Sequence, residues 1–261
     1  MSPLPGRYRF GIYHWRRRAA SIAVALVAAG GAVLLCRRSE HRGRRLAAAA
    51  IGLAALARVA SVARRALSPP PWALERAKYD ALARRLPLDD ADRVLDVGCG
   101  TGRSLVGFAP HVSPGTEVLG LDVFDDRIIL GNGPALARRN GARAGLEVTP
   151  VAGDAAALPV AAGSIDVVTA CRVLHDLEAR VADDALRELH RACAPDGVVG
   201  ILELPLLPDG VPTDRDPEAY WSDRVSAAGL RIDLLERVDR PGSDEPYVLI
   251  VAAPASGARD R

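Results

Sequence analysis

The pattern of apolar and polar residues divides the chain into two parts with different periodicity. Near the N-terminus, two apolar runs of 18 residues each cover residues 19–36 and 46–63. An α-helix rises about 1.5 Å per residue, so each run would extend about 27 Å, close to the hydrocarbon thickness of a bilayer. Polar residues 37–45 separate the two runs. We therefore expect residues 1–66 to form a basic, apolar segment that holds a transmembrane hairpin.

Two other interpretations of this segment stay open. Arg16, Arg17 and Arg18 precede an apolar core, as in a signal peptide, although no small-x-small cleavage pattern follows. Alternatively, the two runs form Ala-rich helices that pack on the soluble domain or lie in the membrane interface. Arg58 makes insertion of the second run less favourable, although a long side chain near a helix end can reach the headgroups. The distribution of arginines favours the cytoplasm for both ends of the hairpin, and hence for the domain that follows.

Beyond a Pro-rich linker at residues 67–72, short apolar strands alternate with helical stretches. An amphipathic helix is expected over residues 73–86, because apolar positions recur there at helical spacing. Strands are expected at residues 93–97, 118–122, 147–152, 165–170 and 198–203, with helices between them. A helix near residues 217–229 and two strands, 232–238 and 247–252, joined by a short turn, complete the domain. This alternation predicts an α/β fold with a mostly parallel sheet, closed by an antiparallel hairpin.

The first of these strands leads into a glycine-rich motif. The sequence runs Val94-Leu95-Asp96-Val97-Gly98-Cys99-Gly100-Thr101-Gly102, with a glycine at every second position after Val97. Glycines in a strand-to-helix turn allow a ligand to lie directly on the main chain, whose N–H groups then face it. A dinucleotide-binding G-x-G-x-x-G motif would need a glycine at position 103, where this chain has Arg103. The spacing therefore favours a nucleotide-like ligand other than NAD.

This D-x-G-x-G-x-G segment resembles motif I of the class I S-adenosylmethionine-dependent methyltransferases. Two further segments carry the same resemblance: Gly153-Asp154-Ala155-Ala156-Ala157-Leu158-Pro159, and the helix at residues 185–191 followed by Pro195-Asp196-Gly197. The resemblance covers residues 72–254. It implies a doubly wound, seven-stranded sheet for a domain over residues 73–254, leaving residues 255–261 as a tail, and it implies S-adenosyl-L-methionine as the cofactor.

The resemblance also assigns residues to the cofactor site. Asp96 corresponds to the carboxylate that engages the ammonium group of the cofactor, often through water. Asp122, at the end of the second strand, would accept hydrogen bonds from the ribose hydroxyls. Asp154 would accept from the adenine amino group. The full set of expected cofactor-binding residues is Asp96, Gly98, Cys99, Gly100, Thr101, Gly102, Asp122, Val123, Phe124, Asp154, Ala155 and Cys171.

His175 follows the fourth strand, where substrate would meet cofactor. Methyl transfer is an in-line displacement, so the protein must chiefly align the reacting atoms in a dry pocket. A base helps when the acceptor is a hydroxyl or a carbon acid, and His175 has suitable chemistry. A role in the pocket wall or at a helix start is the alternative. We expect Cys171 and Cys193 to be buried small apolar side chains, although thiols that bind substrate occur in arsenite-type methyltransferases.

The charge distribution limits the classes of binding partner that we expect. The net charge of +2 combines +12 through residue 65 with −10 over the rest of the chain. A domain of charge −10 repels a phosphate backbone, so we expect no nucleic-acid partner. The four cysteines have no metal-ligand spacing, and no metal site is expected. A membrane anchor favours a lipophilic acceptor, such as a quinone-type or isoprenoid compound or a lipid headgroup. The alternative is a membrane-tethered, non-catalytic cofactor-sensing or scaffold protein on the same fold.

Overall fold

The computed structural model describes residues 8–68, 70–212 and 214–255, and its chain divides into two compact units. One unit holds the described residues up to Ala73 together with Asp125–Asn132, and the other holds the remainder. Residues 1–7 of the predicted N-terminal segment, residue 69 of the predicted linker and all of the predicted tail except Ala255 lie outside the described residues. The sequence did not predict that Asp125–Asn132 belong to the N-terminal unit.

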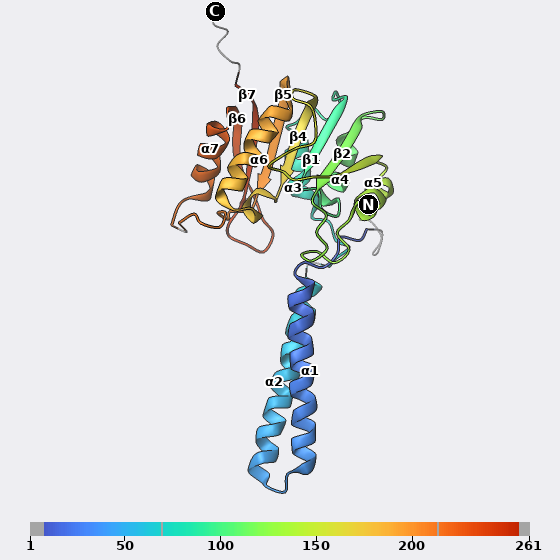
Figure 1. The fold of residues 1–261 in the computed structure, drawn as a ribbon, viewed down its shortest axis with the longest axis vertical. Helices are drawn as coiled ribbons and strands as arrows, with labels where there is room; N and C mark the ends of the chain where they lie inside the picture. The colour runs from blue at the N-terminus through green and yellow to red at the C-terminus, as the bar shows by residue number, and fades with distance from the viewer. Residues whose placement is uncertain (1–7, 69, 213, 256–261) are drawn as a thin grey trace, which may run out of the picture. The chain divides into compact units, whose positions relative to one another are not determined.

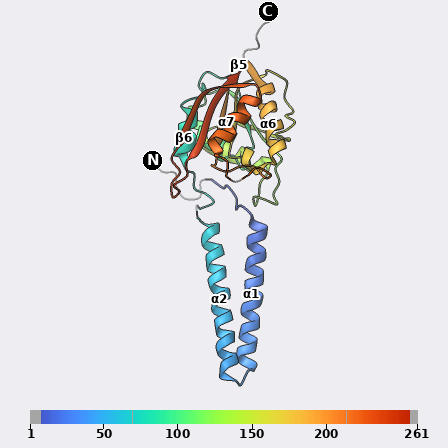
Figure 2. The same cartoon turned by 90° about the vertical axis from the view of Figure 1, so that its left-hand side faces the viewer.

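The N-terminal unit is built on a hairpin of two long helices, α1 (Trp15–Arg38) and α2 (Arg42–Ala66), which lie side by side (Figures 1 and 2). Both helices are long and apolar enough to cross a bilayer, by length and composition. Only 11% of the most apolar window of α1 and 17% of that of α2 is buried. Polar contacts join their described residues at two points: Arg58 Nε donates to Ser21 Oγ at 3.0 Å, and the Arg18 guanidinium donates to the Arg65 carbonyl oxygen at 3.2 Å. These helices therefore leave most of their apolar surface uncovered by the residues described.

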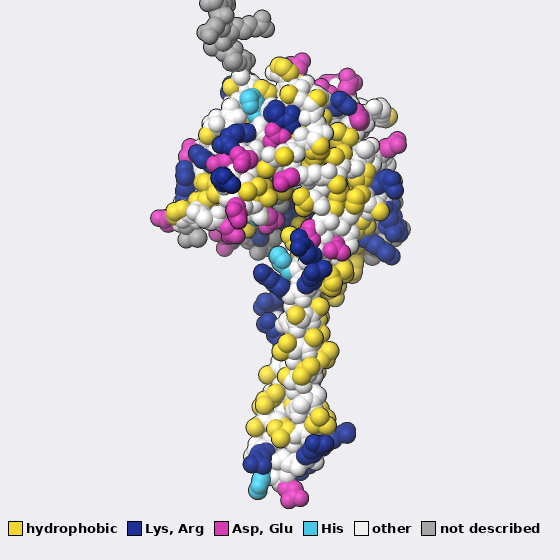
Figure 3. Space-filling view, viewed as in Figure 1, with side chains coloured by type: hydrophobic (Ala, Val, Ile, Leu, Met, Phe, Trp, Pro, Cys, Tyr) yellow, Lys and Arg dark blue, Asp and Glu magenta, His cyan; other side chains and the backbone are white. Residues whose placement is uncertain are grey.

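The surface of the hairpin is apolar along its length and basic at its two ends (Figure 3). The exposed large apolar side chains are Val24, Leu26, Val27, Val33, Leu34, Leu35, Leu46, Ile51, Leu53 and Leu56. The turn between the helices is shorter than expected, because residues 37–38 and 42–45 are helical and only residues 39–41 lie between the helices. Arginine is a good helix former, and basic residues in the last turn of a helix interact favourably with its dipole.

The second unit contains a seven-stranded sheet in the order β3-β2-β1-β4-β5-β7-β6. Five strands are parallel, namely β1 (Arg93–Val97), β2 (Glu117–Asp122), β3 (Val148–Ala152), β4 (Ile165–Cys171) and β5 (Cys193–Glu203). The last two, β6 (Leu230–Val238) and β7 (Tyr247–Pro254), form an antiparallel hairpin, and β7 is also antiparallel to β5. The predicted α/β class and its closing hairpin are confirmed. The strand order reverses between β1 and β4, which is where ligands bind in open parallel sheets.

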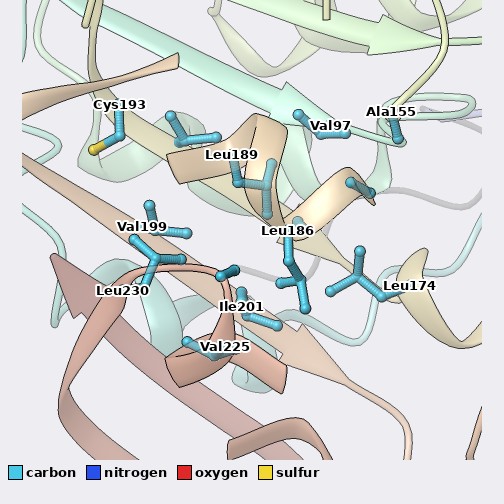
Figure 4. Close-up of a cluster of buried hydrophobic side chains, with 14 of the residues drawn as sticks. Val97, Ala155, Leu174, Leu186, Leu189, Cys193, Val199, Ile201, Val225 and Leu230 are labelled. Atoms are coloured by element: carbon cyan, nitrogen blue, oxygen red, sulfur yellow. The ribbon is translucent and has the colours of Figure 1, made fainter. Parts of the chain in front are cut away.

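Helices cover both faces of this sheet (Figure 1). One face carries α6 (Ala179–Ala192) and α7 (Pro217–Ala227), and the other carries α3 (Arg76–Ala83), α4 (Arg103–Phe108) and α5 (Pro134–Ala144). Short 3-10 helices span Ala109–His111 and Leu174–Asp176. Figure 4 shows the apolar core between the sheet and the helices α6 and α7, in which Leu186 and Leu189 of α6 lie near Val199 and Ile201 of β5. The predicted helical spacing of apolar residues in α6 thus points its apolar face at the sheet.

Some boundaries differ from those the sequence predicts. The helix expected over residues 73–86 is limited to α3, since the chain leaves the helix before Pro87. Strand β5 begins at Cys193, so the Pro195-Asp196-Gly197 segment, which precedes the strand expected at residues 198–203, is part of the strand. A Cβ on Gly197 would lie 2.7 Å from the Asp166 carbonyl oxygen, so the glycine allows this close pairing with β4. The register between β4 and β5 shifts at this segment, from the Ile165–Cys193 pair to the Val167–Val198 pair, so the segment forms an irregularity within the strand.

Candidate functional site

The turn after β1 is the first part of the candidate site, and it depends on its glycines. Gly98, Gly100 and Gly102 all have positive φ, at 72°, 52° and 83°. A Cβ on Gly98 would lie 2.4 Å from the Val173 side chain, which excludes any other residue there. The turn is closed by a hydrogen bond from the Gly102 N–H to the Cys99 carbonyl oxygen at 2.7 Å. The predicted glycine motif therefore forms a tight bend between β1 and the start of α4.

Two buried side chains support this bend from inside the protein. Asp96 is completely buried, and its carboxylate accepts from the Thr169 hydroxyl at 2.8 Å and from the Ser104 hydroxyl. Burial raises the pKa of Asp96 to about 7, although the two hydroxyl donors work in the opposite direction. Asn140 of α5 donates to the Thr101 carbonyl oxygen at 2.8 Å. In this structure Asp96 supports the turn, and its contact with a cofactor ammonium stays a prediction.

Asp122 connects the tip of β2 to the glycine turn. One carboxylate oxygen accepts from the Gly100 N–H at 2.9 Å and the other from the Phe124 N–H at 2.7 Å. Its side chain is half-buried, so the carboxylate lies at the edge of the sheet. The next two residues of the expected cofactor-binding set differ: Val123 is 66% exposed, whereas Phe124 packs against the core and has a positive φ of 53°.

The tip of β3 lies next to these groups. The Gly153 N–H donates to the Asp122 carbonyl oxygen at 3.1 Å, which joins the ends of β2 and β3. Asp154 is exposed and accepts from the Ala156 N–H at 2.9 Å, whereas Ala155 is buried. The structure thus brings together the acids that follow β2 and β3 with the glycines that follow β1. Positive-φ glycines beside two accessible carboxylates fit a ligand with hydroxyl and amino donors.

A second cluster lies at the tips of β4 and β5, around His175. Its Nδ1 lies 2.5 Å from an Oε atom of Glu203, a carboxylate that is completely buried. Glu203 also accepts from the backbone N–H groups of Val173 at 2.9 Å and Leu174 at 2.8 Å. Burial disfavours the charged imidazole, but the hydrogen bond and negative charge of Glu203 outweigh it, and the pKa of His175 is raised above its usual 6.5.

Sequence reasoning did not identify Glu203 as a functional residue. The available signal was an acid at the end of a strand expected to lie next to the one that precedes His175. Because β4 and β5 are parallel neighbours, their carboxyl ends meet at the same edge of the sheet. Glu203 therefore orients the imidazole of His175 and leaves its Nε2 for other contacts, of which Asp176 at 3.5 Å is one.

A buried lysine adds a third group that the sequence analysis missed. Lys78 of α3 is 4% exposed, and its Nζ lies 2.8 Å from both the Tyr247 hydroxyl and a Glu75 carboxylate oxygen. Burial and, to a smaller extent, the nearby charge of Arg172 lower the pKa of Lys78 to about 8, against the opposing effect of Glu75. Burial also raises the pKa of Tyr79, which accepts a hydrogen bond from Arg172. The tips of β4 and β7 thus carry several cationic and phenolic groups.

The two cysteines considered for substrate binding lie at opposite ends of their strands. Cys171 ends β4 and Cys193 begins β5, so the parallel arrangement separates them. Both are buried, and burial raises the pKa of each thiol, to about 12 for Cys193. The structure therefore places only Cys171 near the candidate site, as a buried side chain.

Comparison with known proteins agrees with this arrangement. Residues 94–197 match the family described as a methyltransferase domain. The chain is 34% identical to a demethylmenaquinone methyltransferase of Lactobacillus johnsonii, over 46% of this chain and 47% of that protein. It is 35% identical to the ubiquinone/menaquinone biosynthesis C-methyltransferase UbiE of Dinoroseobacter shibae, over 52% of each chain. The chain therefore spans about half the length of these curated relatives.

Solved structures give the same fold. The 1,6-didemethyltoxoflavin-N1-methyltransferase of Burkholderia thailandensis, solved with its substrate and S-adenosylhomocysteine, has a TM-score of 0.50 and 20% sequence identity. The alignment covers 68% of this chain and 78% of that one. Together with the glycine motif and the strand order, the match over residues 94–197 supports a methyltransferase domain, and the solved structure has the same fold.

Proposed function

We propose that this chain is a membrane-anchored methyltransferase that transfers a methyl group from S-adenosylmethionine to a small, lipophilic acceptor with an ionisable hydroxyl or carbon acid. The observation that carries the proposal is the meeting of two clusters at one edge of the sheet. The glycine turn and Asp122 follow β1 and β2, and the His175–Glu203 pair follows β4 and β5. The proposed cofactor site and the proposed proton acceptor would thus flank the position where the strand order reverses.

The first cluster has the groups that such a cofactor needs. Asp122 would accept from the ribose hydroxyls, Asp154 from the adenine amino group, and the Ala155 N–H would donate to a ring nitrogen. Gly98, Gly100 and Gly102 would let the main chain approach the methionyl part, with Cys99, Thr101, Val123, Phe124, Asp96 and Cys171 completing the expected set. When bound, the cofactor supplies an electrophilic methyl group on a sulfonium.

The second cluster would act on the acceptor. With Nδ1 hydrogen-bonded to Glu203, the imidazole of His175 has Nε2 as its second proton site. Nε2 would take the proton from the acceptor as its oxygen or carbon forms the new bond to the methyl carbon and the carbon–sulfur bond breaks. Glu203 would stabilise the imidazolium that results, because a buried carboxylate interacts strongly with a neighbouring positive charge. His175 is thus the proposed base, and Glu203 positions it.

A quinone-type acceptor is supported by the relatives and by the hairpin. The names of the two curated relatives refer to menaquinone and ubiquinone synthesis. This chain matches about half of the length of each relative. The apolar helices α1 and α2 would keep the protein at a bilayer, where isoprenoid compounds reside. The arginine distribution favours the cytoplasmic side for the methyltransferase domain. The proposal includes neither a metal nor a nucleic acid as a partner.

Transfer of a labelled methyl group tests this function. Full-length protein in detergent is supplied with methyl-labelled S-adenosylmethionine and either a short-chain demethylated hydroquinone or a total membrane lipid extract. Label is expected in the organic phase with wild-type protein, and a loss of about 100-fold or more is expected for His175→Ala. His41→Ala, which changes an exposed histidine at the hairpin turn, is the matched control. Cofactor binding without any transfer would support the sensor or scaffold alternative instead.

Membrane attachment has its own test. The protein should remain in the membrane fraction through a carbonate wash, because about 18 apolar residues per helix match the bilayer core. Val27→Asp, at the middle of α1, should weaken insertion, since a charge at the bilayer centre costs about 3 kcal/mol. Arg37→Ala, at the basic end of the same helix, is the control. Complete release of wild-type protein by high salt would contradict the anchor.

A further inference from the structure

The segment that leads into α1 is paired with the loop that follows β2. In the N-terminal unit, the His14 N–H donates to the Ile128 carbonyl oxygen at 2.7 Å, and the Leu130 N–H donates to the Ile12 carbonyl oxygen at 3.1 Å. These two bonds flank an antiparallel bridge between Tyr13 and Ile129. Residues 125–132 are therefore held by main-chain bonds to the residues just before the hairpin. We call residues 11–15 the strap.

A side-chain contact reinforces the strap. The indole Nε1 of Trp15 donates to the Asp126 carbonyl oxygen at 2.7 Å. Trp15 is also the first residue of α1, so this bond fixes the loop at the base of the hairpin. Asp125, at the start of the loop, accepts from the backbone N–H and the guanidinium of Arg127, which gives the loop a local turn of its own.

Gly11 shows that the close approach is built into the sequence. Its φ is 70°, which is unfavourable for other residues, and a Cβ there would lie 2.4 Å from the Leu130 carbonyl oxygen. The same Cβ would lie 2.7 Å from Cγ2 of Ile129. Only glycine therefore lets the strap lie directly on the loop, and a methyl group at this position would separate them.

The two ends of the loop continue into the candidate cofactor site. At the N-terminal end, the Phe124 N–H donates to Asp122, whose other oxygen holds the Gly100 N–H. At the C-terminal end, the chain enters α5, where Asn140 holds the Thr101 carbonyl oxygen. Ala137 of α5 also packs 3.3 Å from the Cβ position of Gly102. One loop thus connects two of the supports of the glycine turn.

We propose that the strap is a positioning element for the cofactor: by fixing residues 125–132, it restricts Asp122 and the start of α5 to the geometry that binds S-adenosylmethionine. The proposal rests on the proposed cofactor site and adds the segment before the hairpin to it. A loop that is already ordered loses less conformational entropy when a ligand binds, so preorganisation increases affinity. Residues far from the glycine motif in sequence would then set cofactor affinity.

Gly11→Ala tests the strap in the full-length protein in detergent. The matched control is Gly43→Ala, a helical glycine on the hairpin whose added Cβ would meet nothing within 4 Å. Hydrogen exchange should show lost protection at Leu130 and His14 in Gly11→Ala, together with faster exchange at Phe124 and Gly100. Protection in β4 and β5 should be unchanged, which shows that the protein is folded. Unchanged exchange at Phe124 and Gly100 despite an open strap would overturn the proposal.

Cofactor binding gives the second readout. Calorimetry with S-adenosylhomocysteine should show about 10-fold weaker binding to Gly11→Ala than to wild type or Gly43→Ala. Leu130→Pro, which removes the N–H that donates to Ile12, should have the same effect, with Leu130→Ala as its control. Equal affinity for S-adenosylhomocysteine in all variants would overturn the proposed role of the strap. Absence of binding to wild type would instead count against the proposed function, and the exchange data alone would then decide for or against the strap.

Discussion

The two halves of the candidate site are built in different ways. The cofactor half uses main-chain groups and short acids at the tips of β1, β2 and β3, and most of its residues lie in short segments that follow each strand. The acceptor half uses the long side chains of His175, which follows β4, and Glu203, which ends β5. We include the Lys78–Tyr247 pair of α3 and β7 in this half, because the charge of Arg172 acts on both Lys78 and His175. The first half can therefore be identified from local motifs, whereas the second exists only after the chain has folded.

The same contrast applies to charge. In the cofactor half, the two acids after β2 and β3 are at least partly exposed, so they can meet a ligand without a large desolvation cost. In the acceptor half, Glu203 is completely buried and Lys78 nearly so, and each has hydrogen-bonded partners. Buried charges of this kind are costly to leave unpaired. Substitutions should consequently be more disruptive in the acceptor half than in the cofactor half.

The largest effect is expected for Glu203→Gln. This change removes the charge that stabilises a protonated His175 and leaves one oxygen to accept from the Val173 and Leu174 N–H groups. Methyl transfer should fall about 1,000-fold, within the range for loss of acid–base catalysis, and the free energy of unfolding should fall by about 3 kcal/mol. Rate assays and denaturant titration measure the two. Glu178→Gln, which changes an exposed acid, is the control. Wild-type rates in Glu203→Gln would remove the acceptor half from the mechanism.

The pH dependence of the reaction should follow His175. A base must be unprotonated, so kcat should rise with pH through a pKa that lies above 6.5 in the wild-type protein. In Glu203→Gln the carboxylate no longer favours the imidazolium, and burial remains, so the midpoint should move to lower pH. Protonated His175 also stabilises the folded protein, and this effect changes with pH in the opposite direction to kcat. The stabilisation is fully present below pH 6.5 and is lost as the pH rises through the raised pKa of His175. If the midpoint of the kcat–pH profile is the same in Glu203→Gln as in wild type, His175 is not the group whose titration controls the rate.

In the cofactor half, Asp122→Asn should have a more selective effect. The amide keeps one acceptor oxygen but replaces the other with a donor, so a hydrogen bond to the Gly100 or Phe124 N–H is lost along with the charge. Affinity for S-adenosylhomocysteine should fall about 10-fold to 100-fold, since a hydrogen bond to a charged group contributes about 1.5–3 kcal/mol. The KM for the acceptor should change little. A large change in acceptor KM with normal cofactor binding would reverse the assignment of the two halves.

These assignments show how much the sequence could predict. The sheet class, the closing hairpin and the glycine turn follow from apolar periodicity and from backbone conformations that glycine alone adopts readily. The Glu203–His175 and Lys78–Tyr247 pairs could not be predicted, because they join residues 28 and 169 positions apart whose register depends on the packed sheet. The pairing of residues 11–15 with the loop after β2 was missed for the same reason. Burial of Asp96 was also not predicted, since its place in the motif suggested a contact with the ligand.

The smallest effect is expected at Asp96. Its pKa in the folded protein is raised to about 7, so folding favours the protonated form, and the stability that this form provides is lost as pH rises from about 4 towards 7. Asp96→Asn keeps the shape without the titration. Its melting temperature should therefore rise by a few degrees relative to wild type between pH 5 and pH 8. A difference that stays constant with pH would show that Asp96 is ionised at low pH in the folded protein.

The most direct test of the central claim is calorimetric titration of full-length protein with S-adenosylhomocysteine, comparing wild type, Asp122→Asn and His175→Ala. The two-part site predicts one binding site per chain in the wild-type protein, binding weakened about 10-fold to 100-fold in Asp122→Asn, and near-normal affinity in His175→Ala, because His175 belongs to the acceptor half. Failure of wild type to bind at millimolar ligand, or equal binding by Asp122→Asn, would contradict the account.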